Sequence, residues 1–256
     1  MDLLLDGIKV NYHQSGEGYP VVLLHGWGVS LEALTPVHQY LEKDFTVYSI
    51  DLPGFGKSTV PQAVWSVYDY AEFAQHFFAA MQIKTPIVIG HSFGGRLTII
   101  LGSEGLCSKI ILVDSAGIRP KRGPDYYLRV YSYKAAKKVM SLPGLCRYQE
   151  KALQVWLKSN PSSDYKQAGG IMRQIFVRVV NEDLSDLLPK ISVPTLLVWG
   201  ENDTATPLSD AKLMEQKIPD SGLAVLKSAG HYSYLDQFGQ FKLILDSFLA
   251  QEKTKQ

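Results

Sequence analysis

GHSFGG, residues 90–95, joins a strand-like run at 86–89 to a helix-like run at 96–101. An apolar strand, Gly-x-Ser-x-Gly and then a helix form the context of a nucleophile elbow, in which the serine sits on a sharp, strained turn. Side chains at positions 90 and 94 would collide with each other or with the neighbouring strand, so both must be glycine. The segment predicts a Ser92 hydroxyl held above a sheet edge, at the start of a helix whose first N–H groups lack partners.

Strand-like and helix-like runs alternate on both sides of this segment. The strand-like runs are residues 21–24, 45–50, 86–89, 109–113, 193–199 and 223–226. The helix-like runs between or after them are residues 31–41, 68–81, 210–217 and 235–249. This alternation predicts an α/β fold with a largely parallel sheet and helices on both faces. Residues 3–5 and 8–13, joined by Asp6-Gly7, predict an antiparallel hairpin at one edge.

The pattern changes between about residues 116 and 191. Tyrosine, lysine and arginine become more frequent there, short helical stretches occur, and no run has a convincing strand pattern. We interpret this block as a helical lid inserted between two consecutive strands. The sequence therefore predicts a single domain over residues 1–256, with a core formed by 1–115 and 192–256 and a lid at about 116–191.

Bulk properties exclude several classes of protein. The formal net charge of +1 is unlike the strongly basic domains that bind nucleic acids. Two cysteines, Cys107 and Cys146, are too few for a disulfide framework and are expected to be reduced thiols. The first residues lack the pattern of a signal peptide, and no apolar run approaches about 18 residues. We therefore expect a cytoplasmic protein without integral membrane association.

A serine hydroxyl becomes a useful nucleophile only when a base takes its proton and an acid orients that base. In a parallel sheet these groups must lie on loops at the carboxyl ends of strands, at the same edge as Ser92. Two loops qualify: residues 200–207, which contain Asp203, and residues 227–232, which contain His231. The sequence therefore predicts Ser92, Asp203 and His231 as a catalytic unit.

The chain resembles the α/β-hydrolase superfamily over essentially its whole length apart from the lid. GHSFGG resembles the elbow of that family, WGEND (199–203) its acid loop, and AGH (229–231) its histidine loop. HGWG (25–28) resembles its oxyanion loop, and DLPGFGKS (51–58) a further strand-to-loop signature. The resemblance implies the α/β-hydrolase fold, with a mostly parallel eight-stranded sheet and a helical lid insertion. The order serine, acid, histidine is also that of the family.

Other residues compete for the role of base. The remaining histidines are His13, His25, His38, His76 and His91. His13 lies in the edge hairpin, whereas His38 and His76 lie in predicted surface helices. His91 is the neighbour of the nucleophile on the elbow and is expected to point elsewhere, and His25 is expected to brace the oxyanion loop by hydrogen bonds. His231 is therefore the favoured base.

Three carboxylates compete with Asp203 for the role of acid. Asp114 ends the strand after the nucleophile helix, a position that some family members use. Asp51 ends an earlier strand but begins a Pro-Gly turn, where aspartate often caps locally. Glu201 is closer to its strand end than Asp203. The resemblance favours Asp203, with Asp114 as its main rival.

An oxyanion hole requires two N–H donors directed at the charge that develops on the substrate oxygen. The resemblance implies that these donors are the backbone N–H groups of Phe93 and Trp27. Because the backbone N–H groups stabilise the charge, we expect the two aromatic side chains to line an apolar pocket.

A serine nucleophile disfavours the epoxide-hydrolase and haloalkane-dehalogenase branches, which use a carboxylate as the nucleophile. No metal-ligand spacing and no Gly-rich phosphate loop occurs, so no cofactor or metal is expected.

The predicted lid is strongly basic. Between Arg119 and Lys158 there are ten basic and two acidic residues, a formal charge of +8. Such a surface is most often a solvated helical face, but it could also attract an acidic substrate, a carrier protein or an anionic membrane surface. An arginine near the pocket could instead hold a carboxylate of the substrate.

Two branches of the superfamily resemble this chain in different motifs. HGWG and DLPGFG resemble the pimeloyl carrier-protein methyl ester esterases, and Gly94-Gly95-Arg96 resembles members that make or break carbon–carbon bonds in menaquinone synthesis and aromatic-ring degradation. The sequence predicts a serine esterase that cleaves a small-molecule carboxylic ester through an acyl-enzyme. The alternatives are a C–C bond hydrolase or lyase with the same triad, and a hydrolase-fold protein that only binds a ligand.

Overall fold

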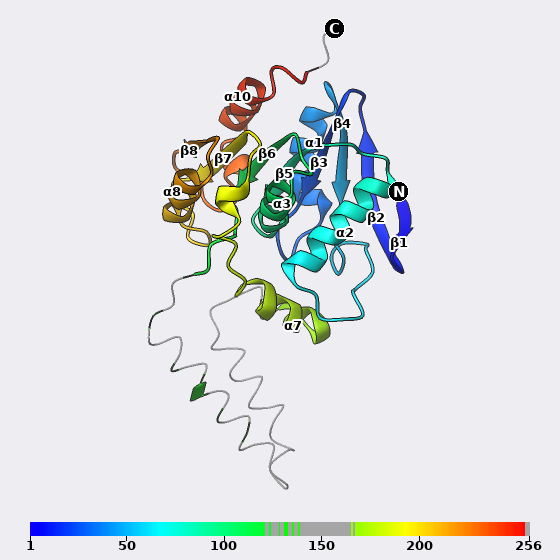
Figure 1. The fold of residues 1–256 in the computed structure, drawn as a ribbon, viewed down its shortest axis with the longest axis vertical. Coiled ribbons are helices and arrows are strands. Elements are labelled where there is room, and N and C mark those ends of the chain that lie inside the picture. The colour runs from blue at the N-terminus through cyan, green and yellow to red at the C-terminus, as the bar shows by residue number, and fades with distance from the viewer. Residues whose placement is uncertain are drawn as a thin grey trace.

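Eight strands form one sheet in this computed structural model, in the order β1-β2-β4-β3-β5-β6-β7-β8 (Figure 1). The structure describes residues 1–120 and 167–253, together with positions 123, 128, 131, 132, 135, 138 and 165. The strands are β1 (Asp2–Leu5), β2 (Ile8–Ser15), β3 (Tyr19–Leu24), β4 (Phe45–Ile50), β5 (Ile87–His91), β6 (Lys109–Val113), β7 (Thr195–Gly200) and β8 (Ser221–Leu226). This confirms the predicted eight-stranded α/β-hydrolase sheet.

Strand direction divides the sheet into an antiparallel edge and a parallel body. β1 pairs with β2, and β2 with β4, in antiparallel register. From β4 across β3, β5, β6 and β7 to β8, neighbouring strands are parallel. The predicted hairpin is present, because Asp6 (φ 50°) and Gly7 (φ 76°) both adopt the left-handed conformation that a two-residue turn requires. The carboxyl ends of β5, β6, β7 and β8 therefore meet at one edge.

Helices cover both faces of the sheet. In the described part of the chain they are α1 (Thr35–Leu41), α2 (Val67–Ala80), α3 (Phe93–Ser103), α7 (Gly170–Val179), α8 (Leu208–Lys217), α9 (Ser233–Asp236) and α10 (Phe238–Phe248), with 3-10 turns η1 (Leu31–Leu34) and η3 (Leu188–Lys190). One buried apolar cluster joins the sheet to α2, α3 and α8, and a second joins it to α1 and α10. Two faces covered by helices explain why the parallel strands read as continuous apolar runs.

Local sequence accounts for where several helices begin and divide. Ser66 starts α2 with a capping box, in which its hydroxyl accepts from the Asp69 N–H and the Asp69 carboxylate accepts from the Ser66 N–H. The predicted helix over 31–41 divides into η1 and α1, with Pro36 near the start of α1. The predicted helix over 235–249 divides at Gln237, whose φ of −128° is not helical.

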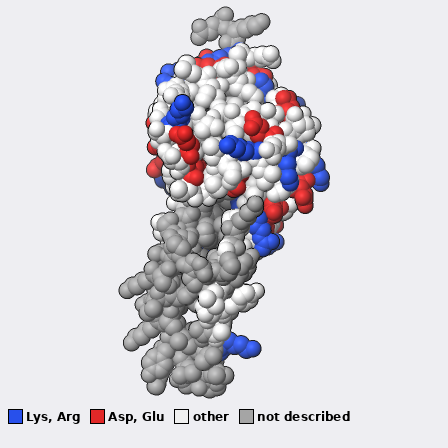
Figure 2. Space-filling model, turned by 90° about the vertical axis from the view of Figure 1, so that its left-hand side faces the viewer, with Lys and Arg blue, Asp and Glu red and all other residues white. Residues whose placement is uncertain are grey.

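The predicted lid at about 116–191 falls mainly on residues outside the described part of the chain, so it stays a prediction. Its described C-terminal flank contains α7, which buries Ile175 and Val179. The predicted basic surface also falls mainly on those residues. Over the described core, basic and acidic side chains are interspersed on the face that Figure 2 shows. Within the described residues, no helix combines the length and the apolar character that crossing a membrane requires.

Candidate active site

The turn between β5 and α3 is the strained elbow that the sequence predicts. Ser92 has φ 50° and ψ −108°, a backbone conformation that costs an L-residue energy. A Cβ on Gly90 would lie 2.2 Å from the Thr98 hydroxyl, and a Cβ on Gly94 would lie 2.1 Å from the Leu24 carbonyl oxygen. Since contacts this short do not occur between real atoms, both positions require glycine. The crowding fixes Ser92 at the carboxyl end of β5.

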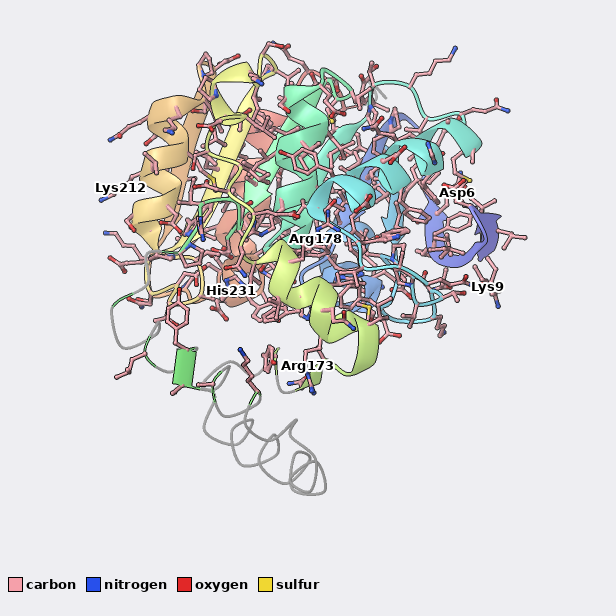
Figure 3. All side chains as sticks on the ribbon, turned by 60° about the horizontal axis from the view of Figure 1, so that its bottom comes forward. Asp6, Lys9, Arg173, Arg178, Lys212 and His231 are labelled. Atoms are coloured by element: carbon pink, nitrogen blue, oxygen red, sulfur yellow. The ribbon has the colours of Figure 1, made fainter. Side chains whose placement is uncertain are left out.

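Three side chains that are far apart in the sequence form one chain of hydrogen bonds at this edge. The Nε2 atom of His231 lies 3.0 Å from the Ser92 hydroxyl oxygen. The Nδ1 atom of His231 lies 2.8 Å from Oδ2 of Asp203. His231 is at the edge of the described core near α7, where Figure 3 shows it. Ser92, His231 and Asp203 therefore have the arrangement in which a base can take a hydroxyl proton while a carboxylate orients that base.

The Asp203 carboxylate is held by more than the histidine. The Thr206 hydroxyl donates to Oδ2 at 2.6 Å. The backbone N–H groups of Ala205 and Thr206 donate to Oδ1 at 2.8 and 3.0 Å. Burial alone would raise the pKa of Asp203, but the hydrogen bonds with His231 and Thr206 outweigh it and hold the pKa below its usual value. The carboxylate is therefore ionised and fixed in orientation at neutral pH.

Asp114, the main rival for the role of acid, binds backbone groups instead. Its two carboxyl oxygens accept from the Gly200 N–H at 2.8 Å and from the Ser233 N–H at 2.9 Å. Burial raises the pKa of Asp114 to about 7. Gly200 begins the loop of Asp203, and Ser233 follows His231 closely, so Asp114 ties together the two loops that carry the acid and the base.

The other two carboxylates also have local partners. Oxygens of Asp51 accept from the N–H groups of Leu31 and Lys57 at 2.8 and 2.9 Å. Glu201 accepts from the Ser228 N–H at 3.1 Å. The local capping that the sequence predicts for Asp51 is therefore present.

Two further histidines support the site without taking part in the hydrogen-bond chain. The Nε2–H of His91 donates to the backbone oxygen of His231 at 2.8 Å, and burial lowers the pKa of His91 to about 3, so its ring is neutral. His25 accepts from the Leu52 N–H at Nε2 and donates from Nδ1 to the Gly26 oxygen. This agrees with the expected bracing role of His25.

His38 and His76 differ from each other, although both were expected on surface helices. His76 is exposed and lies 2.6 Å from Asp6, as that expectation implies. For His38 the expectation is wrong, because its side chain is only 3% exposed. It lies on the inner face of α1, where its two ring nitrogens contact the hydroxyls of Ser15 and Ser49.

A cavity of about 550 Å³ opens beside Ser92 and His231. Its aromatic wall contains Trp27, whose ring centroid is 5.3 Å from that of Phe93 and 5.1 Å from that of Phe176 on α7. The loop before Trp27 passes directly against the serine, because a Cβ on Gly26 would lie 3.3 Å from the Ser92 Cβ. The structure thus places Trp27 and Phe93, the expected oxyanion donors, at the wall of this cavity.

Arg96 is a lining residue that sequence reasoning did not assign to the site. Its side chain is buried, it lines the cavity, and its Nη1 donates to the Glu182 backbone oxygen at 2.8 Å. Burial lowers the pKa of Arg96 to about 10, so the guanidinium remains charged at neutral pH. Its position one turn after Ser92 on α3 was the available signal. The role of Asp114 in joining two loops had no comparable signal, because those loops meet only in the folded chain.

Comparisons with known proteins find similarity in sequence and in fold. A family model described as alpha/beta hydrolase fold matches residues 19–238. A pimeloyl-[acyl-carrier protein] methyl ester esterase of Aeromonas salmonicida is 26% identical, over 95% of this chain and 100% of that protein. An esterase from Exiguobacterium antarcticum is 26% identical with a TM-score of 0.74, over 97% of this chain and 98% of that one. A meta-cleavage product hydrolase from Pseudomonas fluorescens shares the fold, with 21% identity, a TM-score of 0.73, and coverage of 98% of this chain and 97% of that one.

Proposed function

This chain belongs to the alpha/beta hydrolase fold family, and from that premise we propose that it is a serine hydrolase acting on a carboxylic ester. The observation that carries the proposal is the continuous path of hydrogen bonds from Asp203 through His231 to Ser92, which ends beside the cavity. The esterases from Aeromonas salmonicida and Exiguobacterium antarcticum support an ester as the substrate.

In the first half of the reaction, the Ser92 oxygen attacks the ester carbonyl while Nε2 of His231 takes the hydroxyl proton. Asp203 holds the imidazole through Nδ1 and stabilises the cation that forms. The negative charge on the carbonyl oxygen is placed against the N–H groups of Phe93 and Trp27. Loss of one such donor typically lowers turnover by about 10²–10³-fold.

In the second half, His231 gives its proton to the leaving alcohol and an acyl-enzyme remains on Ser92. Water then enters, loses a proton to His231 and attacks the acyl carbonyl, which releases the acid.

The aromatic wall formed by Trp27, Phe93 and Phe176 suits an apolar acyl or alcohol group. Helix α7, in the C-terminal part of the predicted lid, contributes Phe176 to this wall.

A C–C bond hydrolase with the same three residues is the second candidate. The buried Arg96 guanidinium at the cavity favours it, because such a cation suits the carboxylate of a dienoic keto-acid substrate. The two candidates share the same nucleophile and the same base. They differ in the bond that is cleaved, which is an ester bond in the first and a carbon–carbon bond in the second.

Pre-steady-state hydrolysis of p-nitrophenyl esters of increasing chain length tests the proposal. An esterase releases a burst of p-nitrophenol, and a fluorophosphonate labels Ser92. A C–C hydrolase instead turns esters over weakly and cleaves dienoic keto-acids. A protein that binds a ligand without turnover on either substrate class, and whose Ser92 resists the fluorophosphonate, would contradict both candidates.

A further inference from the structure

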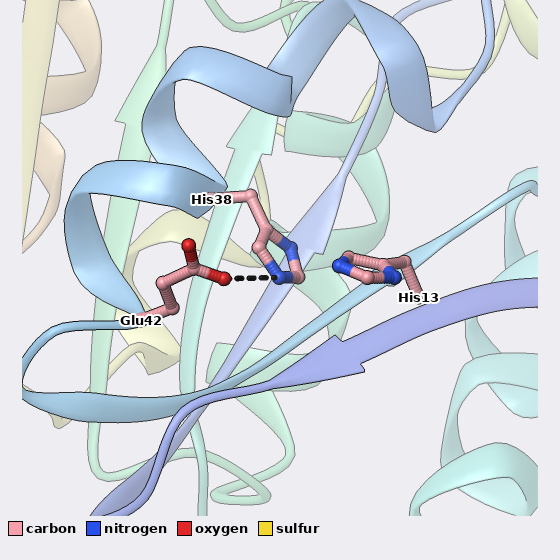
Figure 4. A group of neighbouring side chains, drawn as sticks. All are labelled: His13, His38 and Glu42. Atoms are coloured by element: carbon pink, nitrogen blue, oxygen red, sulfur yellow. Dashed lines mark ion pairs between the residues drawn. The ribbon is translucent and has the colours of Figure 1, made fainter.

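A second cluster of side chains with ligand chemistry lies between β2 and α1. His13 and Ser15 are two residues apart on β2, so they share one face of the strand. His38 and Glu42 are four residues apart at the end of α1, so they share one face of the helix. The two faces meet, and within the described residues only His13, His38 and Glu42 form a group of three side chains close enough to share a metal ion (Figure 4).

The separations within this cluster suit one ion after a small adjustment. The ligand atoms of His13, His38 and Glu42 all lie within 4.8 Å of one another, and Nε2 of His38 is 3.8 Å from Oε2 of Glu42. Zinc binds nitrogen and carboxylate oxygen at about 2.0–2.2 Å, so two ligands of a tetrahedral ion lie roughly 3.3 Å apart. The Glu42 side chain is 34% exposed and His13 is exposed, so both can move by the remaining distance.

The environment of His38 prepares it as a ligand. Its Nδ1 lies 2.7 Å from the Ser49 hydroxyl, which can accept the ring proton and leave Nε2 free for a metal. Outer partners of this kind orient metal-binding histidines. Burial, together with the nearby His13, lowers the pKa of His38 to about 4, so its ring is neutral at pH 7. Ser15 contacts His38 Nε2 and donates to Glu42, so it can remain as an outer partner of the carboxylate.

The hydrogen bonds of this cluster join His38 to Ser15 and Ser15 to Glu42, but they do not include His13. No described residue forms a hydrogen bond with the His13 ring, yet its centroid lies 4.5 Å from that of His38. Two imidazoles and one carboxylate whose ligand atoms lie this close together can supply three ligands to a metal ion. Two histidines and one glutamate are a ligand set that zinc accepts, with water as the fourth ligand.

We propose that His13, His38 and Glu42 bind one Zn²⁺ ion. The three residues do not line the cavity beside Ser92, so the site is separate from the proposed catalytic residues. The ion would join the strand edge at β2 to α1, and it would stabilise that edge without a part in ester cleavage.

Equilibrium dialysis of the purified protein against Zn²⁺ tests the proposal, with zinc content and calorimetry as readouts. The wild-type protein is expected to keep one equivalent of Zn²⁺ per chain at neutral pH. His13→Ala replaces an exposed side chain and therefore folds, and it is expected to weaken binding by more than the roughly 10- to 100-fold loss typical of an outer partner. Ser49→Ala is expected to show that smaller loss.

Two control variants locate the ion. His76→Ala removes an exposed histidine beside a carboxylate elsewhere on the surface and is expected to keep the equivalent. His231→Ala removes the histidine that contacts Asp203, and this variant is also expected to keep its equivalent of Zn²⁺. Co²⁺ bound to the wild-type protein should give the absorption of a tetrahedral site, and His13→Ala should abolish it.

Three outcomes would overturn the zinc site. They are unchanged affinity in His13→Ala, loss of the equivalent in His231→Ala, and binding by the wild-type protein at millimolar concentrations only. None of them concerns ester cleavage, and fluorophosphonate labelling of Ser92 is expected to be the same with and without zinc. Failure of this inference is therefore distinct from failure of the proposed function.

Discussion

Two histidines in this molecule have nearly the same hydrogen-bond distances but different surroundings. His231 lies 3.0 Å from a serine hydroxyl through Nε2 and 2.8 Å from Asp203 through Nδ1. His38 lies 2.8 Å from a serine hydroxyl through Nε2 and 2.7 Å from the Ser49 hydroxyl through Nδ1. Both histidines therefore have a serine hydroxyl beside an imidazole nitrogen, and this contact alone does not distinguish the proposed catalytic site from the cluster at His38.

The position of the carboxylate separates the two histidines. Asp203 lies on the far side of the His231 ring, so it favours a proton on Nδ1 and stabilises the imidazolium. Glu42 lies on the serine side of the His38 ring and accepts the proton of Ser15 itself. In addition, His231 is 23% exposed at the cavity, whereas His38 is 3% exposed. A short contact between serine and histidine thus does not define a nucleophile without the carboxylate behind the ring and space for a substrate.

Removing the two serine hydroxyls gives the largest expected contrast. Ser92→Ala is expected to lower ester turnover by about 10⁴-fold or more, because the nucleophile is lost. Ser15→Ala, the matched variant at the other histidine, should leave kcat/KM within a few-fold. Steady-state kinetics and circular dichroism of both variants measure this. Similar losses in the two folded variants would break the distinction.

Removing the carboxylate behind the ring is expected to have the next largest effect. Asp203→Asn keeps the size of the side chain but cannot hold the reactive tautomer of His231, so kcat should fall by about 10³–10⁴-fold. Thr206→Val removes only one donor to that carboxylate and should cost far less. Asp114→Asn serves as the comparison with the rival acid. A greater loss of kcat in Asp114→Asn than in Asp203→Asn would transfer the role of acid to Asp114.

Crowding at the elbow is expected to appear as a loss of stability. In Gly94→Ala the new Cβ would meet the Leu24 carbonyl oxygen at 2.1 Å, so the free energy of unfolding should fall by about 1–3 kcal/mol. Gly239→Ala in α10 meets no atom within 4 Å and should be neutral or slightly stabilising. Urea denaturation of both variants checks this. Equal stability of Gly94→Ala and the wild type would mean that the elbow relaxes easily.

The last expected effect concerns pH. Burial raises the pKa of Asp114 to about 7 from 3.8, so between these values the folded protein holds a proton that the unfolded chain has lost. The stability that the Asp114 carboxyl contributes to the folded state is therefore fully present below pH 3.8 and declines as the pH rises toward 7. Over this pH range, the free energy of unfolding of the wild type should decline relative to that of Asp114→Asn. The difference between the two slopes against pH should correspond to at most one bound proton. Parallel curves would show that the carboxyl titrates normally.

The sequence predicted the elements that depend on local pattern. All the expected strands are present. The central ones, β3 and β5, are buried on both faces and are therefore continuously apolar, and the elbow is present because its glycines leave no alternative. His38 was misplaced, since a helix pattern does not reveal which face meets the sheet when the inward residue is polar. Asp114 was missed as a support of the site, because it touches Gly200 and Ser233 only once separate loops have packed. Thr206 was missed although it lies in the loop of Asp203, because a turn pattern does not reveal which hydroxyl faces the carboxylate.

The positive φ of Ser92 also limits which residues could replace it. A β-branched side chain is a severe outlier in that backbone region, so threonine would be excluded there even though its hydroxyl has the same chemistry as that of serine. Cysteine and aspartate, which are not branched at Cβ in this way, remain compatible with the turn. The backbone of the elbow thus restricts the repertoire of nucleophiles before any question of reactivity arises.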